Sequence, residues 1–507
     1  MTAKRPLVLP ALLGAITTLL HLLTATDSYG YFRDELYYLA NAQHLGFGYV
    51  EHPPMIGWIT WLERTLFGDS QLAIRLLPAV AAGVTVFLVC RIAAEMGGQR
   101  FAQLLAGVAT ALAPGYVGVF GILSMNAFDI MFWAAAVLIV TRLLRTGDSR
   151  LWLAFGLVAG LGLENKISLL FLGFGLVAGL ILDRQWHHFT GRWLWLGGAL
   201  AGLLFLPYLV WQAQHDWAML EFMSRATQFK NLPLLPTEFL SAQMLQMNPV
   251  AVPIALAALA FYFFTREGRP FRPLGWAVVV ILLVMISQRA KPYYFAPAFP
   301  LLLAPGGVLI EKLTGYRGWR WIRPAYPVLI VLSGFALVPL AKPVLPVEAF
   351  VRYQARLGMA PRTSERHELE RLPQDFADRL GWQELAETVA EVYHSLPSED
   401  RARACIFGHN YGQAGAIDLF GPELGLPSAL SGHNTYWWWG PGECRGEVLI
   451  IIGGGREAPE EFFEQVELAA TFTCQDCMPY ENNKSIWVCR GLSVPIDEIW
   501  PSLRSYN

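Results

Sequence analysis

The chain has 507 residues, of which 54% are hydrophobic and only 15% are charged, and its mean hydropathy is +0.38. An ordinary soluble protein carries about 25% charged residues, so these values exclude a typical soluble enzyme and a disordered chain. They indicate a polytopic membrane protein. The net charge of −2 gives no sign of nucleic-acid binding.

Eleven apolar segments follow one another up to residue 341, and each is predicted to be a membrane-spanning helix. They cover residues 7–26, 72–90, 101–119, 125–141, 151–163, 167–182, 193–211, 249–264, 273–287, 293–310 and 324–341. Several are shorter than the roughly 20 residues that cross a bilayer alone, so their ends are expected to lie inside the protein. Residues 1–26 also resemble a signal peptide, but an uncleaved first span fits the long apolar stretch better.

The charges divide the chain near residue 341. Residues 342–507 hold 14 Lys and Arg but 24 Asp and Glu, whereas residues 1–341 have a net charge of +8. We predict a membrane domain over 1–341 and a soluble domain over 342–507. Most Lys and Arg residues of the membrane domain fall on one set of connections, which places the N-terminus in the cytoplasm. With 11 spans, the C-terminal domain is then extracytoplasmic.

The richest group of polar residues lies in the first outer connection, residues 27–71, which contains RDELYYLA and EHPP. Ionisable groups beside apolar spans are costly and therefore candidates for function; here they are Arg33, Asp34, Glu35, Glu51 and His52. Neighbouring residues of a helix point about 100° apart, so the two adjacent acids are expected to do different jobs. A structural network of ion pairs is the alternative.

Three further polar groups lie at connections on the same predicted side. Asn126 and Asp129 in SMNAFDI are three residues apart and share a helix face. Lys166 in ENK lies between two short spans, where it could reach a buried anion. The last motif, QRAKPYY, contributes Arg289, Lys291, Tyr293 and Tyr294. Carboxylates, cations and tyrosines at one membrane interface suit a hydroxyl acceptor and a phosphate-bearing lipid.

These motifs resemble the family-39-type glycosyltransferases of the GT-C superfamily. Those enzymes are polytopic and related to protein O-mannosyltransferases and to the aminoarabinose transferase of lipid A. The matching elements RDELYYLA, EHPP, SMNAFDI, ENK and KPYYFAPAFPLL occur in the family's order between residues 31 and 304. The resemblance implies transfer of a sugar from a polyprenyl phosphate to a hydroxyl of a protein, lipid A or an envelope glycan. The reaction would invert the anomeric centre, on the outer face of the bacterial cytoplasmic membrane.

The resemblance also implies roles for the candidate residues. Asp34 would be the catalytic base, assisted by Glu35 and Glu51. The substrate-binding residues would be Arg33, His52, Asn126, Asp129, Lys166, Arg289, Lys291, Tyr293 and Tyr294. Among these, Lys166, Lys291 and Tyr293 would hold the lipid phosphate. No metal ligand is predicted, although carboxylates beside a phosphate could share a divalent cation.

The C-terminal residues predict a small α/β domain. ACIFG, EVLIIIGG and SIWVC are typical of buried strands, and FADRLGWQELAETVAEVYHSL and APEEFFEQVELAATF of helices. The motifs GHNYGQAGAIDLFG and SGHNTYWWWGP resemble the tails of bacterial family members that have no assigned substrate. Five of the six cysteines lie here, and an extracytoplasmic location permits a disulfide. CQDC could be a bridge, half of a metal site or two free thiols.

Two other interpretations compete with the enzyme. A transporter or lipid flippase would favour inverted repeats and polar groups near the bilayer midplane. The sequence shows no such symmetry, and its polar groups lie toward one face. The second is a sensor that binds partners through its outer domain. It would not explain the acidic residues beside the apolar spans.

Overall fold

The computed structural model describes residues 7–26, 28–363 and 365–506, which fold into two compact units. Unit 1 comprises Met1–Thr26, Leu72–Trp211 and Pro233–Pro346, and unit 2 comprises Asp27–Gln71, Gln212–Leu232 and Val347–Asn507. Packing thus divides the chain differently from its composition, because the first outer connection folds with the C-terminal residues. The boundary between membrane and soluble residues near 341 stays a prediction.

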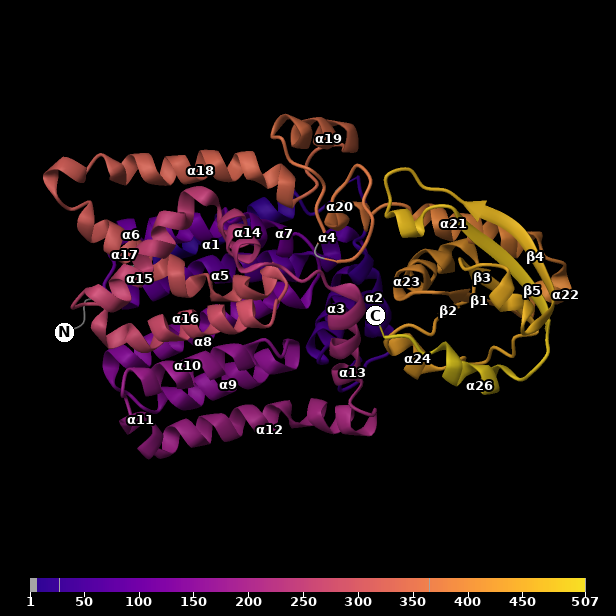
Figure 1. The fold of residues 1–507 in the computed structure, drawn as a ribbon, viewed down its shortest axis with the longest axis horizontal. Coiled ribbons are helices and arrows are strands. Elements are labelled where there is room, and N and C mark those ends of the chain that lie inside the picture. Colours follow the sequence, from indigo (N-terminus) through magenta and orange to yellow (C-terminus); the bar gives the residue numbers. More distant parts are fainter. Residues whose placement is uncertain (1–6, 27, 364, 507) are drawn as a thin grey trace. The chain divides into compact units, whose positions relative to one another are not determined.

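Unit 1 is a bundle of helices (Figure 1). Its longer helices are α1 (Val8–Leu23), α5 (Leu76–Glu95), α6 (Arg100–Ala111), α8 (Met125–Thr146), α9 (Leu151–Asn165), α10 (Leu169–Leu182), α12 (Arg192–Gln214), α14 (Pro236–Met247), α15 (Val252–Phe264), α16 (Arg272–Ser287), α17 (Pro300–Leu313) and α18 (Ile322–Ala341). Shorter helical turns are α4 (Gln71–Ile74), α7 (Pro114–Val119), α11 (His187–Thr190), η2 (Pro249–Ala251), η3 (Arg269–Phe271), η4 (Pro292–Ala298) and η5 (Arg317–Trp319). Each of the predicted apolar segments is helical over most of its length. The segment 101–119 is divided because Pro114, which has no N–H, starts a new helix.

The described residues contain five helices that are long and apolar enough to cross a membrane, or up to seven if each of two bent pairs is one span. The bent pairs are Pro236–Met247 with Pro249–Phe264, at 96°, and Pro292–Ala298 with Pro300–Leu313, at 52°. Helices α1, α9 and α10 are apolar but shorter. The protein is therefore an integral membrane protein, and the predicted number of 11 spans is not confirmed.

The centre and the edge of unit 1 differ in burial. In the most apolar stretch of the spans that contain α5 and α8, 61% of the residues are buried, against 22% and 17% for those of α12 and α18, which flank the bundle in Figure 1. Small residues allow close approach of the backbones. A Cβ added to Gly14 in α1 would lie 2.7 Å from the carbonyl oxygen of Gly83 in α5.

Unit 2 combines short helices with one sheet. Its helical elements are α2 (Arg33–Gln43), α3 (Met55–Phe67), α13 (Ala218–Arg225), η1 (Ala226–Lys230), α19 (Val347–Arg356), α20 (Gln374–Ala377), α21 (Trp382–Ser395), α22 (Ser398–Arg401), α23 (Tyr411–Phe420), η6 (Gly421–Leu424), α24 (Thr435–Trp439), α25 (Glu457–Glu460), η7 (Pro479–Glu481), α26 (Ile496–Ile499) and η8 (Trp500–Leu503). The predicted helix FADRLGWQELAETVAEVYHSL corresponds to α20 and α21.

The five strands are β1 (Ala404–Gly408), β2 (Ala429–Leu430), β3 (Val448–Ile452), β4 (Phe463–Phe472) and β5 (Lys484–Leu492). They lie in the order β2-β1-β3-β5-β4. Strand β1 is parallel to β2 and β3, whereas β5 is antiparallel to β3 and β4. The three predicted strands are confirmed, and β3 is buried along its whole length, as its apolar sequence requires.

The helix predicted over APEEFFEQVELAATF is wrong. Only its first residues are helical, in α25, and residues 463–472 form the edge strand β4. The backbone pairs with β5 from Phe463, opposite Leu492, to Phe472, opposite Lys484. This ladder overrides a weak local helical pattern. The exposed glutamates of β4 suit an edge strand, since charges there discourage pairing with another chain.

The C-terminal residues contain a disulfide, which the sequence analysis allowed for. Cys405 in β1 is bonded to Cys444, 39 residues later. Cys474 and Cys477 of CQDC are free thiols, as are Cys90 and Cys489.

Candidate active site

The two adjacent acids of the first outer connection lie in the first turn of α2. Glu35 is fully buried, and its carboxylate accepts a hydrogen bond of 2.8 Å from the backbone N–H of Phe32. This bond satisfies a free donor at the helix N-terminus. The Asp34 side chain is partly exposed, and its Oδ1 accepts a hydrogen bond of 2.8 Å from the hydroxyl of Tyr411. The two acids therefore make different contacts.

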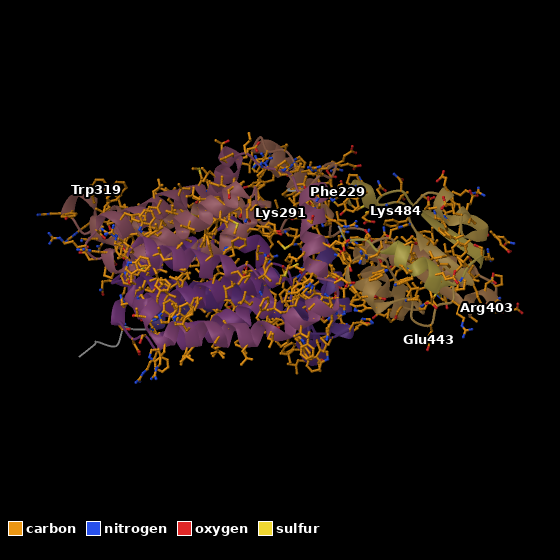
Figure 2. The ribbon with its side chains drawn as sticks, turned by 60° about the horizontal axis from the view of Figure 1, so that its bottom comes forward. Phe229, Lys291, Trp319, Arg403, Glu443 and Lys484 are labelled. Atoms are coloured by element: carbon orange, nitrogen blue, oxygen red, sulfur yellow. A yellow bond between two sulfur atoms is a disulfide. The ribbon has the colours of Figure 1, made fainter. Side chains whose placement is uncertain are left out.

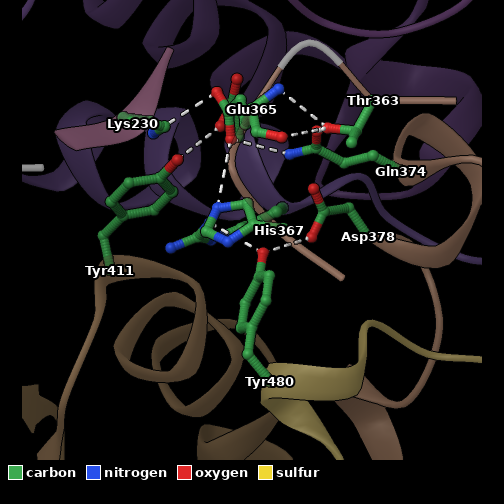
Figure 3. A network of polar contacts seen from close by, with 10 residues as sticks. Lys230, Thr363, Glu365, His367, Gln374, Asp378, Tyr411 and Tyr480 are labelled. Atoms are coloured by element: carbon green, nitrogen blue, oxygen red, sulfur yellow. Dashed lines mark hydrogen bonds and ion pairs between the residues drawn. The ribbon is translucent and has the colours of Figure 1, made fainter. Parts of the chain in front are cut away.

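Arg33 lies between two tyrosines from the C-terminal part of unit 2. Its guanidinium carbon is 4.5 Å from the ring centre of Tyr411 and 5.6 Å from that of Tyr480. The guanidinium donates to the Tyr480 hydroxyl at 3.1 Å, and this hydroxyl donates to Asp378 at 2.9 Å (Figure 3). Burial raises the pKa of Asp378 to about 6, and the nearby positive charge of Arg33 opposes the rise.

A second polar group in Figure 3 centres on the buried Glu365. Its carboxylate accepts a hydrogen bond from Gln374 at 2.9 Å and lies 3.4 Å from His367 Nε2. Lys230, from the Gln212–Leu232 stretch of unit 2, is 3.7 Å from the same carboxylate. Residues from two separate stretches of sequence thus meet in unit 2.

Glu51, in the EHPP element, belongs to a third group. The hydroxyl of Tyr37 lies 3.2 Å from Glu51 Oε2 and 2.7 Å from Thr435 Oγ1. Burial raises the pKa of Glu51 to about 8, so the carboxyl group is mainly protonated at neutral pH. The Tyr37 hydroxyl is within donor distance of both oxygens, and it accepts a hydrogen bond of 3.2 Å from the backbone N–H of Thr435.

His52 is almost fully buried, and both ring nitrogens have partners. Nδ1 lies 2.9 Å from the carbonyl oxygen of Pro53, and Nε2 lies 3.2 Å from the amide nitrogen of Asn41. Burial lowers the pKa of His52 to about 4, so the ring is neutral. In this structure His52 connects the EHPP turn to α2 through its hydrogen bond with Asn41. A contact between His52 and substrate stays a prediction.

The predicted cationic group lies in unit 1. Lys166 follows α9 directly, and its Nζ donates to Asn126 Oδ1 at the start of α8. The same Nζ is 5.4 Å and 5.1 Å from the ring centres of Tyr293 and Tyr294 in η4. The structure therefore brings together three of the predicted motifs, from α8, the end of α9 and η4.

The remaining predicted residues of unit 1 have varied surroundings. Asp129 is buried in α8 and accepts a hydrogen bond of 2.5 Å from Ser168. Lys291 directly precedes η4 and is partly exposed (Figure 2), and Arg289 is exposed. These cations belong to the same connection as the two tyrosines that face Lys166.

The tail residues that touch Arg33 and Asp34 were missed by the sequence analysis. Tyr411, Asp378 and Tyr480 lie more than 300 residues further along the chain. The spacing of Gly412 and Gly415 in GHNYGQAGA was a signal for them, because repeated glycines in a helix often mark a close approach of another backbone.

Metal binding has no support from the described side chains. Among them, no group of three or more His, Cys, Asp and Glu residues could hold a metal ion. The divalent cation considered from the sequence stays a prediction.

The architecture is that of a polytopic helical membrane protein, and its fold is similar to a known one. The crystal structure of ArnT from Cupriavidus metallidurans bound to undecaprenyl phosphate aligns with a TM-score of 0.59, covering 95% of this chain and 97% of that one at 14% identity. The apo structure of the same protein gives a TM-score of 0.61, covering 94% and 97% at 14% identity.

Sequence comparisons agree with the fold. The family model of the dolichyl-phosphate-mannose-protein mannosyltransferases matches residues 51–211. The undecaprenyl phosphate-α-4-amino-4-deoxy-L-arabinose arabinosyl transferase of Edwardsiella ictaluri (strain 93-146) is 27% identical over 320 residues, 58% of this chain. The match spans 56% of that relative's length. The chain is therefore similar in sequence to the protein mannosyltransferases and to an aminoarabinose transferase, and it shares the fold of the ArnT structures.

Proposed function

We propose that the protein is a glycosyltransferase that takes a sugar from a polyprenyl-phosphate donor and passes it to a hydroxyl acceptor of the bacterial cell envelope. The donor class is supported by the curated relative, whose name specifies an undecaprenyl-phosphate sugar, and by the undecaprenyl phosphate bound to the similar ArnT structure. The reaction takes place on the extracytoplasmic face of the inner membrane, with the N-terminus in the cytoplasm.

The observation that carries this proposal is the setting of Asp34. Its carboxylate is partly exposed at the N-terminus of α2, where the helix dipole favours a negative charge. One oxygen is held by Tyr411, and we assign the other to an incoming acceptor hydroxyl. A carboxylate in this state can accept a proton, a contribution of about 10²–10⁴-fold to the rate.

The chemical step is a single displacement. The acceptor hydroxyl gives its proton to Asp34 while its oxygen forms a bond to the anomeric carbon of the sugar. The bond from that carbon to the phosphate oxygen breaks, and the polyprenyl phosphate leaves with the electron pair. Attack from the face opposite the leaving group inverts the anomeric centre, as in inverting glycosidases.

The Lys166 group suits the leaving phosphate. The ammonium group contacts Asn126 and the faces of Tyr293 and Tyr294, and its charge also acts on the buried carboxylate of Asp129. A cation in this position attracts the negative charge that the phosphate carries both in the bound donor and after it leaves. We assign Lys166, with Lys291 and Arg289 of the η4 connection, to the donor phosphate.

The other acids of the first outer connection take supporting roles. Glu51 carries a proton at neutral pH because burial raises its pKa to about 8, so it is suited to donate a hydrogen bond to a substrate oxygen. Glu35 caps α2 and thereby fixes the turn that carries Asp34. A flippase is not favoured by the relatives, which are transferases by name.

The test is a transfer assay with the purified full chain, labelled polyprenyl-phosphate sugars and bacterial membranes. The proposal predicts that label leaves the lipid phosphate and becomes covalently attached to an envelope component. Movement of labelled lipid between leaflets of a vesicle, with no covalent product from any donor, would contradict it and favour the flippase.

A further inference from the structure

We propose that Tyr411 is a positioning residue of the transferase, so that the C-terminal part of unit 2 completes the active site. This inference rests on the proposed function, in which Asp34 is the base. Tyr411 does not act on substrate in this account. It fixes the rotation of the Asp34 carboxylate, so that the acceptor meets an oxygen of defined direction.

The hydrogen bond from the Tyr411 hydroxyl to Asp34 Oδ1 is 2.8 Å long. Among the described residues, Tyr411 is the only one whose side chain donates a hydrogen bond to the Asp34 carboxylate. An aspartate held at one oxygen presents the other at a fixed angle, whereas an unheld carboxylate rotates freely. Proton transfer needs heavy atoms about 2.6–3.2 Å apart, so this angle matters for the rate.

The ring of Tyr411 is itself held on several sides. It stacks on His433 with ring centres 4.9 Å apart and an angle of 27°, and it lies 4.7 Å from the ring of Tyr37. The guanidinium of Arg33, the residue before Asp34, lies over the same ring at 4.5 Å. One tyrosine therefore contacts two consecutive residues of α2, one through its ring and the other through its hydroxyl.

The start of α23 fixes the backbone of Tyr411. The Asn410 side chain accepts hydrogen bonds from the N–H groups of Gly412 and Gln413, at 2.9 and 3.1 Å. The buried carboxylate of Glu481 accepts from the side-chain amides of Asn410 and Gln413, both at 2.7 Å. Charge-assisted hydrogen bonds of this kind are strong. They therefore fix the backbone at the start of α23, which carries Tyr411.

Two glycines let α23 approach α2. A Cβ on Gly412 would lie 2.9 Å from Cγ of Arg33, and a Cβ on Gly415 would lie 3.0 Å from the carbonyl oxygen of Leu36. Larger residues at these positions would push the helices apart and break the hydrogen bond between Tyr411 and Asp34. These features of GHNYGQAGA, namely the glycines, the cap and the aromatic stack, thus all help to place the Tyr411 hydroxyl against Asp34.

The test replaces Tyr411 with Phe, which removes the hydroxyl and keeps the ring over Arg33. The matched control is Tyr436→Phe. Tyr436 donates to Asp418, another aspartate of the same unit, at 2.6 Å. Both variants lose one Tyr–Asp hydrogen bond at α23, but only one of these bonds involves Asp34. Both should show a similar fall in melting temperature.

The expected result is a split in the kinetic constants. Tyr411→Phe should lower kcat by about 10–100-fold, the range for a hydrogen bond to a charged group, while KM for the polyprenyl-phosphate sugar stays within about twofold. Tyr436→Phe should leave kcat within about twofold. In an Asp34→Asn background, Tyr411→Phe should cause no further loss, because the two residues act as a unit.

The outcomes separate the two proposals. If Asp34→Asn keeps wild-type turnover, the proposed function itself fails. If Asp34→Asn is inactive but Tyr411→Phe behaves like Tyr436→Phe, the positioning role is overturned and the proposed function stands. A further loss of about 10-fold or more from Tyr411→Phe in the Asp34→Asn background would mean that Tyr411 acts independently of Asp34, and would also overturn the inference.

Discussion

The Asp34 group of unit 2 and the Lys166 group of unit 1 are built in different ways. Asp34 is bonded to a residue 377 positions away, within a network of tyrosines, acids and amides. Lys166 is bonded to a residue only 40 positions away, and the ends of apolar helices bring the two together. One group resembles the interior of a soluble enzyme, and the other a helix-end site in a membrane protein.

The difference suits the roles that we propose for the two groups. A base must meet a proton at a short distance and a narrow angle, so it needs hydrogen bonds that fix its position. A cation that stabilises a phosphate acts through a Coulomb energy that falls gradually with distance. We therefore expect Asp34 to govern kcat and Lys166 to govern donor binding, and the following predictions test this division.

The largest expected effect is that of Asp34→Asn. Without a base, kcat should fall by about 10²–10⁴-fold, while the donor still binds because the Lys166 group is intact. The check is turnover of labelled donor, with Asp418→Asn as the control for loss of an aspartate elsewhere in unit 2. Unchanged turnover in Asp34→Asn would end the assignment.

Lys166→Ala should act mainly on the donor. Removing one charge-assisted contact to a phosphate should weaken donor binding by about 10–100-fold, with a smaller effect on kcat at saturating donor. Donor titration measures this, and Lys312→Ala, which breaks an exposed ion pair with Glu267 in the same unit, is the matched control. Equal donor affinities in the two variants would contradict the role of Lys166.

Gly415→Ala tests the close packing behind the Asp34 group. The added Cβ would meet the backbone of Leu36, and such overpacking costs about 1–3 kcal/mol. We expect a lower melting temperature and a lower kcat. Gly198→Ala in α12, where a Cβ meets nothing within 4 Å, should be neutral or slightly stabilising. A melting temperature as high as that of the control would show that α23 can shift without loss of stability, and would contradict the prediction.

Glu51→Gln should change the pH dependence of stability more than activity at neutral pH. The folded pKa of about 8 lies above the ordinary value of 4.5, so the folded state holds the proton longer and the wild type loses stability as pH rises from about 4.5 to about 8. The variant lacks this fall. Melting temperatures at pH 5 and pH 8 measure it, with the exposed Glu368→Gln as control. The same fall with pH in wild type and Glu51→Gln would refute the raised pKa.

Local patterns were sufficient to predict most of the fold. The apolar segments are helical over most of their length, since a helix satisfies its own backbone hydrogen bonds among apolar side chains, and the buried strands β1 and β3 carry continuous apolar residues. The prediction failed at residues 463–472. Pairing with β5 decides that segment, and such pairing is not encoded in the periodicity of a short stretch.

The candidate site could be predicted only in part for the same reason. Asp34, Glu51 and Lys166 stand out because charges beside apolar spans are costly. Tyr411 and Tyr480 do not stand out, since a tyrosine in a soluble segment is ordinary until its partner is known. The packing of the first outer connection with the C-terminal residues depends on contacts over more than 300 positions, which one sequence does not reveal.

The most direct test measures donor binding and sugar transfer on the same preparations of wild type, Asp34→Asn and Lys166→Ala. We predict opposite effects of the two substitutions on binding and transfer. Asp34→Asn binds the labelled polyprenyl-phosphate sugar like wild type but transfers almost none of it, and Lys166→Ala binds it weakly but still transfers it when the donor is saturating. Transfer at the wild-type rate by Asp34→Asn, at any donor concentration, would contradict the central claim that this carboxylate takes the proton of the acceptor.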